Sequence, residues 1–406
     1  MKTSGRNTHL RAGTDYFLIG GLIAVSGFPF FLVAQANFMI LFIITLFVYL
    51  KRSLPFDFRV LPIVLSFLVV EILQFMFIKP FDPVMISGTF IRMFLGFFIV
   101  MISGRNFTNY YVNIICFFSL VSFIFYPISM LFPPFFNFFT DHVSPFFSSP
   151  FGANEEFYVV WPTNILFCFH ECVLNEFRNP GPFWEPGLFA VFLNLALLFH
   201  LIRGGELFNW KTWVLLVAIG TTFSTAGYIA CFVLLFSFYL VRQSPLRKIV
   251  FSLVATPIIL FLYYSLNFLS TKVDENISLA STTTSSRFGS ASVDLADFAS
   301  SPYIGWGRGV MRYGGRTFSF FSEEQHRNNS VTDLLATYGI FLFILFFFSY
   351  YQSFKYMCIS SGFSSKFALY ALLVVLTLGF SQSIFLRPFF YSLLFVQFVY
   401  KKEFSA

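Results

Sequence analysis

The sequence predicts an all-α polytopic membrane protein, and three observations support this fold class. The chain of 406 residues is 57% hydrophobic. Only 11% of its residues are charged, whereas a soluble domain carries about 25%, so there are too few charges to cover a water-soluble globule. Its apolar runs are repeatedly about 17–21 residues long, which matches the ~20 residues that a helix needs to cross a bilayer.

About twelve apolar runs follow one another along the chain, and each is expected to be one membrane-spanning helix. The pairs at 15–50, 212–241 and 366–400 are each too long for one helix. Breakers between the paired runs, among them Pro29 and Pro388, favour tight hairpins. The expected helices cover residues 15–31, 34–50, 60–78, 84–103, 109–132, 184–202, 212–224, 227–241, 249–268, 331–351, 366–380 and 388–400.

The positive charges orient this bundle. With twelve spans both termini face the same side, and most Lys and Arg residues fall in short loops or tails on that side. Cytoplasmic loops carry an excess of Lys and Arg, so this side is predicted to be the cytoplasmic side of an inner membrane. Segment 1–14 is then a cytoplasmic tail, because no cleavage pattern of small residues follows the first apolar run. The net charge of +7 reflects this topology and does not indicate nucleic-acid binding.

Two long segments are expected on the outer, periplasmic side. The first is rich in Phe and Pro and is expected to lie on the membrane surface. The second begins with a Ser- and Thr-rich stretch, and its Gly-rich part matches no nucleotide-binding fingerprint. The predicted organisation is a five-helix membrane segment with the tail (1–132), the first periplasmic loop (133–183), central membrane helices (184–268), the second periplasmic loop (269–330) and C-terminal membrane helices (331–406).

Arginines and one glutamate gather on the outer side. RNPGPFWEPG places Arg178 and Glu185 at the start of the sixth span, and Pro180 and Pro182 hold Arg178 within a turn of the membrane. An arginine at that depth is costly and usually has a partner. A guanidinium fork binds phosphate oxygens bidentately, which indicates a diphosphate on an apolar tail. For any single arginine of these loops the alternative is a tolerated, solvated charge.

Other polar residues allow more than one interpretation. Glu71 and Arg92 lie inside the third and fourth spans, where they either form an ion pair or line a substrate cavity. The segment CFHEC contains Cys168 and Cys172, for which a disulfide, two thiols and a zinc site are all considered. His142, in the first loop, is an alternative to the second-loop histidine His326.

Three motifs carry a resemblance to a known family. The segment 178–187 at the start of a span resembles a motif of the bacterial O-antigen and capsule polymerases (Wzy-type), which form a superfamily with the O-antigen ligases. TFSTAGYIACFVLL (222–235) is similar to the hairpin that follows it. SPYIGWGRG (301–309) and HRNNSVTDLLATYGIFLFILF (326–346) are similar to the motif pair that closes the family's large outer loop. The resemblance covers residues 170–350.

The resemblance implies a GT-C-like enzyme that transfers a growing glycan from undecaprenyl diphosphate to a hydroxyl of a second lipid-linked unit. It implies Arg178 as the catalytic residue that stabilises the leaving diphosphate, and His326 and Glu185 as candidate bases. Its substrate-binding residues are Arg178, Arg287, Arg308, Arg327 and Asn328. No metal, other cofactor or nucleotide sugar is expected. The expected partners are the undecaprenyl-diphosphate-linked oligosaccharides, membrane lipids and a chain-length regulator.

The sequence departs from the family pattern in two places. Ligases commonly carry an arginine where this chain has Ser224-Thr225-Ala226-Gly227, which favours a polymerase over an O-antigen ligase. The family's adjacent His-Asn pair is here His326-Arg327-Asn328-Asn329. A polysaccharide transporter or flippase is the alternative from another class, but transporters tend to show two similar halves with matching broken helices, and this chain shows no such repeat.

Overall fold

The computed structural model describes residues 3–33, 35–78, 83–147, 150–151, 159–160, 162–169, 178–242, 287–308 and 329–401. Most of these residues are helical, and the one sheet among them pairs β1 (Pro150–Phe151) antiparallel with β2 (Val159–Val160). Four helical stretches are long and apolar enough to cross a membrane, as expected of a membrane protein. They are Phe58–Phe77, Ile86–Leu131, Thr225–Arg242 and Ser330–Ser360.

Most helices follow the predicted apolar runs, and those at 133–138 and 287–300 lie in the predicted loops. In the first half they are α1 (Thr3–Gly27), α2 (Pro29–Val33), α3 (Gln35–Lys51), α4 (Leu61–Phe77), α5 (Pro83–Ser103), α6 (Phe107–Leu131) and α7 (Pro133–Phe138). Then come α9 (Pro186–Ile202), α10 (Trp210–Thr221), α11 (Thr225–Arg242), α14 (Arg287–Ser300), α16 (Ser330–Ser360), α17 (Phe367–Ser381), α18 (Pro388–Ser392) and α19 (Val396–Lys401). Single turns are η1 (Phe58–Val60), η2 (Gly104–Asn106), η3 (Phe139–Val143) and η4 (Ser144–Phe146).

Helix α1 begins at Thr3, so nearly all of the expected cytoplasmic tail is helical, and its side of the membrane stays a prediction. One expectation needs correction. The expected last span, 388–400, is two short helices, α18 and α19. The expected span at 249–268 lies outside the described residues, and the total of twelve crossings stays a prediction.

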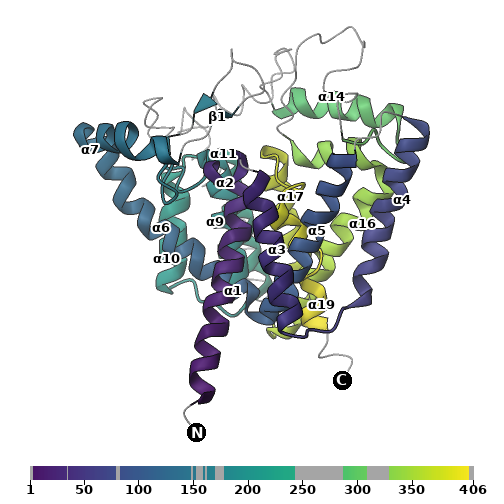
Figure 1. The fold of residues 1–406 in the computed structure, drawn as a ribbon, viewed down its shortest axis with the longest axis horizontal. Coiled ribbons are helices and arrows are strands. Elements are labelled where there is room, and N and C mark those ends of the chain that lie inside the picture. Colours follow the sequence, from purple (N-terminus) through teal and green to yellow (C-terminus); the bar gives the residue numbers. More distant parts are fainter. Residues whose placement is uncertain are drawn as a thin grey trace.

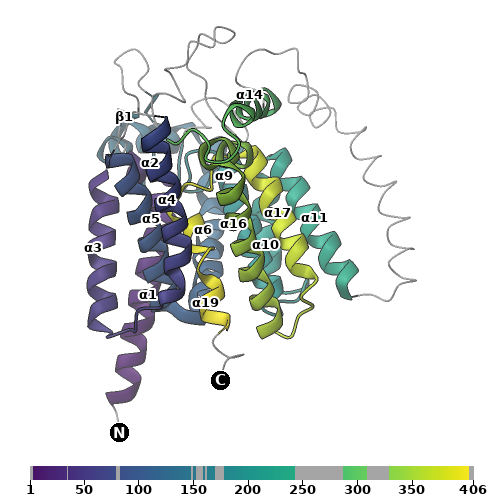
Figure 2. The same ribbon diagram turned by 90° about the vertical axis from the view of Figure 1, so that its right-hand side faces the viewer.

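The two ends of the bundle differ. Helix α1 begins and α19 ends at one end, which we call the proximal end; β1, α7 and α14 lie at the opposite, distal end (Figure 1). Figure 2 shows α14 lying across the distal end. There α14 packs on α16, and the Thr332 hydroxyl of α16 donates a hydrogen bond to the buried Asp294 carboxylate at 2.7 Å.

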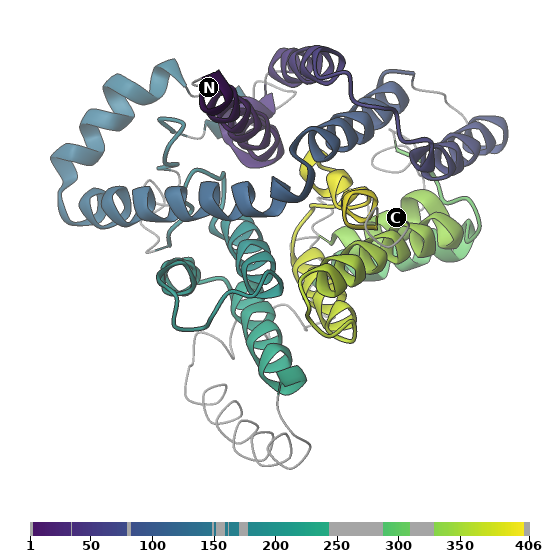
Figure 3. The same ribbon diagram turned by 90° about the horizontal axis from the view of Figure 1, so that it is seen from below.

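The interior of the bundle is built around α9 and α18. All residues of α9 from Pro186 to Phe199 are buried, as expected for a helix that is apolar on every side. Helix α18 packs against α5, because Gly96 lets the two backbones meet: a Cβ there would lie 2.8 Å from the Ser392 nitrogen. Figure 3 shows α18 and α19, in yellow, inside the ring of longer helices.

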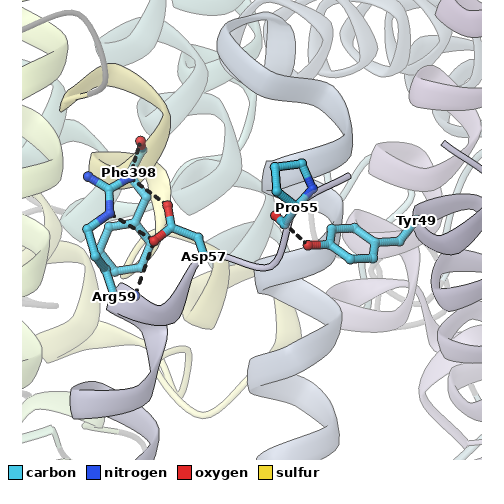
Figure 4. A network of polar contacts seen from close by, with 5 residues as sticks. All are labelled: Tyr49, Pro55, Asp57, Arg59 and Phe398. Carbon is cyan, nitrogen blue, oxygen red and sulfur yellow. Dashed lines mark hydrogen bonds and ion pairs between the residues drawn. The ribbon is translucent and has the colours of Figure 1, made fainter. Parts of the chain in front are cut away.

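Polar side chains fasten the proximal end. Arg59 forms a salt bridge with Asp57, and its Nη2 donates to the Phe398 carbonyl of α19 at 3.1 Å (Figure 4). The Tyr49 hydroxyl donates to the Pro55 carbonyl at 3.0 Å in the same region. The Arg59 bond ties the connection between α3 and α4 to the C-terminal helix, and the Tyr49 bond ties it to α3.

Candidate functional site

The segment before α9 holds Arg178 at the distal end. The buried Asn179 side chain donates hydrogen bonds to Ser122 Oγ of α6 and Thr221 Oγ1 of α10, at 3.0 and 2.9 Å. Its Oδ1 accepts from the Gly181 N–H at 2.9 Å, and its backbone N–H donates to the Thr221 carbonyl at 3.0 Å. The residue after Arg178 is therefore fixed to two helices.

Glu185 begins α9 beside Arg287, the first residue of α14. Glu185 is the extended N-cap residue, and its side chain makes no capping hydrogen bond. Its charge and that of Arg178 both act on Arg287. Burial lowers the pKa of Arg287, the Glu185 carboxylate opposes this, and Arg178 lowers the pKa further. An arginine still carries its charge at neutral pH after such a shift, so these three charges meet where α9 and α14 begin.

A break in α16 receives the segment that carries Arg308. At Gly339 the backbone has φ 74° and ψ 178°, which interrupts the helix and leaves helix carbonyls without intrahelical partners. Backbone groups of the segment 302–307 pair with the broken helix. The bonds run from Trp306 N–H to Ala336 O, from Gly307 N–H to Thr337 O and from Ile340 N–H to Pro302 O, each at 2.9 Å. The described part of the motif, 301–308, therefore docks the residue before Arg308 on α16.

Arg308 then reaches toward α4 and α5. Its Nη1 donates to Thr89 Oγ1 of α5 at 3.3 Å. Its charge acts on Glu71 of α4 and on Arg92 of α5. The described residues show no salt bridge between Glu71 and Arg92, so the ion-pair interpretation is wrong. Both residues instead lie around Arg308.

Arg387 lies on the loop between α17 and α18. Its guanidinium carbon lies 4.1 Å from the centroid of the Trp184 ring, within cation–π distance. Desolvation lowers the pKa of Arg387 to about 10, although part of its surface is exposed. The Glu185 carboxylate opposes the shift, and the charges of Arg92 and Arg308 add to it. Arg387 thus interacts both with Glu185, which lies near Arg287, and with Arg308, which lies near Glu71 and Arg92.

Together these residues form a contiguous charged site that we call the arginine cluster. Its members are Arg92, Arg178, Arg287, Arg308 and Arg387, with Glu71 and Glu185 among them. Five arginines stand against two carboxylates in number, so the cluster has a positive balance. A concentration of like charge with several bidentate donors is the arrangement that attracts a multiply charged anion such as a diphosphate.

The predicted site residues divide into two groups. The structure brings Arg287 and Arg308, from distant parts of the sequence, into one set of interacting charges with Arg178 and Glu185. His326, Arg327 and Asn328 lie outside the described residues, as does Cys172. The alternative histidine, His142, lies on η3 with its ring against Phe138, at 5.5 Å between centroids.

Sequence reasoning missed Arg387 as a site residue and left the role of Arg92 open. A signal for Arg387 exists: it directly precedes Pro388 at the start of an apolar run, much as Arg178 precedes the prolines before α9. Arg92 has no such local signal, since only the packing of α5 against the segment 302–308 brings it to the other arginines.

An apolar groove of about 360 Å³ lies between α1, α3 and α6. Gly20 and Gly21 of α1 line it, with Phe28, which directly follows α1, and Leu41 from α3. The groove approaches the arginine cluster, because the Phe28 ring lies 5.1 Å from the ring of Phe183, the residue before the Trp184 that stacks on Arg387. The volume and lining suit a hydrocarbon chain.

The chain matches no protein-family model and no curated protein. The resemblance to O-antigen and capsule polymerases therefore depends on the three motifs of the sequence.

Proposed function

We propose that the protein is an O-antigen or capsular polysaccharide polymerase of the bacterial inner membrane, with both termini in the cytoplasm. It joins undecaprenyl-diphosphate-linked repeat units at the periplasmic face by glycosyl transfer. The observation that carries this proposal is a set of interacting arginines at one end of an apolar bundle: Arg287 interacts with Arg178 and Glu185, and Arg387 interacts with Glu185 and Arg308. A site that concentrates fixed guanidinium groups stabilises negative charge that develops on a departing diphosphate.

The reaction moves a glycan between two lipid carriers. The bond between the anomeric carbon and the phosphate oxygen of the donor breaks, and a hydroxyl oxygen of the acceptor repeat unit bonds to that carbon. The hydroxyl proton goes to a base, for which Glu185 and His326 are the candidates. The electron pair of the broken bond stays on the diphosphate, and the arginine cluster balances this charge.

The lipid tail also has a place in this proposal. The groove between α1, α3 and α6 is almost entirely apolar and comes close to the arginine cluster through Phe28 and Phe183. A polyprenyl diphosphate with its head among the arginines can lay part of its chain there.

The deciding experiment is complementation of a strain that lacks the gene. Wild-type protein is expected to restore long-chain surface glycan, and Arg178→Ala is expected to leave only single repeat units on the lipid core. Arg178→Lys keeps the charge without the bidentate fork and is expected to restore short chains only. Arg242→Ala is the matched control, because Arg242 lies at the proximal end of α11 against Phe238, at 4.1 Å from the ring centroid. A full ladder with Arg178→Ala would show that this residue has no role in polymerisation.

The same strain separates the alternatives. Loss of an O-antigen ligase leaves no glycan on the lipid core, and loss of a flippase leaves lipid-linked repeat units on the cytoplasmic leaflet. Either phenotype in place of single repeat units on the core would replace the polymerase proposal.

A further inference from the structure

Gln74 of α4 fastens the segment that carries Arg308. Its side chain is 5% exposed, and its Nε2 donates hydrogen bonds to two backbone carbonyls, those of Ile304 and Thr337, the latter at 2.7 Å. Ile304 belongs to the segment 302–307 and Thr337 to the broken turn of α16. One amide group therefore ties three parts of the chain together.

The contact between Gln74 and the docked segment is tight. Gly307 has φ 72°, and a Cβ at this position would lie 2.9 Å from Gln74 Oε1. The next residue is Arg308. Glu71, one turn before Gln74 on α4, acts on Arg308 through its charge. The face of α4 with Glu71 and Gln74 thus meets both the backbone before Arg308 and its guanidinium group.

We propose that Gln74 is a positioning residue, which acts through Arg308 to hold its guanidinium group in the arginine cluster. This inference rests on the proposed function, in which the cluster binds a diphosphate. Without the two amide donors, the Ile304 carbonyl loses a partner and the segment 302–307 is released from α4. Displacement of a binding group by about 1 Å can reduce a rate by about 10²-fold. A substitution of Gln74 can therefore weaken the interaction of Arg308 with the diphosphate, although Gln74 does not contact the diphosphate itself.

A double-variant cycle tests this inference with purified full-length protein and inorganic pyrophosphate as the probe. Thermal stabilisation by pyrophosphate gives the affinity of each variant. Gln74→Met and Arg308→Ala are each expected to weaken binding roughly tenfold, and the double variant is expected to bind no more weakly than Arg308→Ala alone, because coupled residues are not additive. Gln352→Met, the same change in α16 on the proximal side of the break at Gly339, is the control and is expected to bind as the wild type does.

Several outcomes overturn the inference. Additive losses in the double variant mean that Gln74 acts independently of Arg308, and wild-type affinity in Gln74→Met means that it has no role. If Gln74→Met does not fold, Gln74→Asn replaces it in the same cycle, since it keeps the donor on a side chain shorter by one methylene.

The cycle also separates this inference from the proposed function. Suppose that Gln74→Met and Arg308→Ala are coupled in pyrophosphate binding, but that Arg178→Ala gives an unaltered glycan ladder. The positioning role of Gln74 then stands, and the polymerase proposal fails. If instead the losses of affinity in the double variant are additive and Arg178→Ala loses the ladder, only the role of Gln74 is removed. If wild-type protein binds no pyrophosphate, the arginine cluster is not a diphosphate site and both proposals fail.

Discussion

Gly305 and Gly339 allow two backbones to approach more closely than a side chain would permit. A Cβ at Gly305 would collide with the Thr337 carbonyl, and a Cβ at Gly339 would collide with the Tyr303 carbonyl. Gly339 also has φ 74° and ψ 178°, a combination that is essentially restricted to glycine. These two residues make it possible for the segment before Arg308 to cap the broken helix.

Gly339→Ala is expected to damage both the fold and the site. The backbone conformation alone costs about 1–3 kcal/mol for a residue with a Cβ, and the collision with Tyr303 adds to this. The measurement is the midpoint of thermal unfolding of the purified protein. The control is Gly362→Ala, where φ is 66° and nothing lies within 4 Å of the added Cβ; strain alone is expected there, at about 1–2 kcal/mol. Equal losses in the two variants would show that docking against α16 contributes nothing.

At this scale, part of the site was predictable. Arg178 and Glu185 could be found because proline, glycine and charge stand directly beside an apolar run, which is a local signal. Arg387 carries a similar signal, since it directly precedes Pro388 at the start of an apolar run. Arg92 joins the cluster only through contacts between distant elements, so neither spacing nor composition indicates its position. Of the two interpretations for Glu71, the ion pair with Arg92 followed from adjacent spans in the sequence, whereas the docked segment brings the charge of Arg308 to Glu71.

At the scale of elements, helix existence was predictable and helix interruptions were not. Each expected span within the described residues corresponds to helical structure, because an apolar run long enough to cross a bilayer must satisfy its own backbone groups. The break of α16 at Gly339 depends on hydrogen bonds from residues 302–307, which belong to another segment. At the division into α18 and α19, the Ser353 hydroxyl of α16 donates to the Leu393 carbonyl and accepts from the Gln397 N–H, so another segment again takes part.

The groove between α1 and α3 gives a prediction for these elements. Gly20→Phe is expected to fill it without disturbing the bundle, because nothing lies within 4 Å of a Cβ at Gly20. Lipid is as apolar as the groove, so a lipid tail displaced from the groove loses only packing contacts. The apparent KM for lipid-linked substrate is therefore expected to rise about tenfold, which corresponds to ~1.4 kcal/mol. Initial rates with purified protein check this.

The control for the groove is Gly13→Phe. Gly13 lies seven residues before Gly20 on the same face of α1, is also open to an added Cβ, and does not line the groove. An unchanged KM in Gly20→Phe, or an equal increase in Gly13→Phe, would contradict a tail in this groove.

On the scale of the whole molecule, the two ends use their charges differently. At the proximal end, cations pair with single carboxylates or cap helix carbonyls: Arg52 forms a 2.7 Å salt bridge with Asp15, and Arg203 donates to the Arg105 carbonyl at 2.8 Å. At the distal end, arginines gather on one another around two carboxylates. The proximal cations are thus neutralised or used as helix caps, whereas the distal pattern places repelling charges together, which suits a site that awaits an anion.

The sidedness of these two ends can be measured directly. Phe208, between α9 and α10 at the proximal end, is 86% exposed, and Phe146, on η4 at the distal end, is 79% exposed. If the arginine cluster lies at the outer face, a membrane-impermeant maleimide is expected to label Phe146→Cys once the outer membrane is permeabilised, while the inner membrane is still intact. Phe208→Cys is expected to react only after the inner membrane is opened, and the wild-type chain gives the background. The reverse pattern would place the arginine cluster in the cytoplasm, where no periplasmic saccharide could reach it.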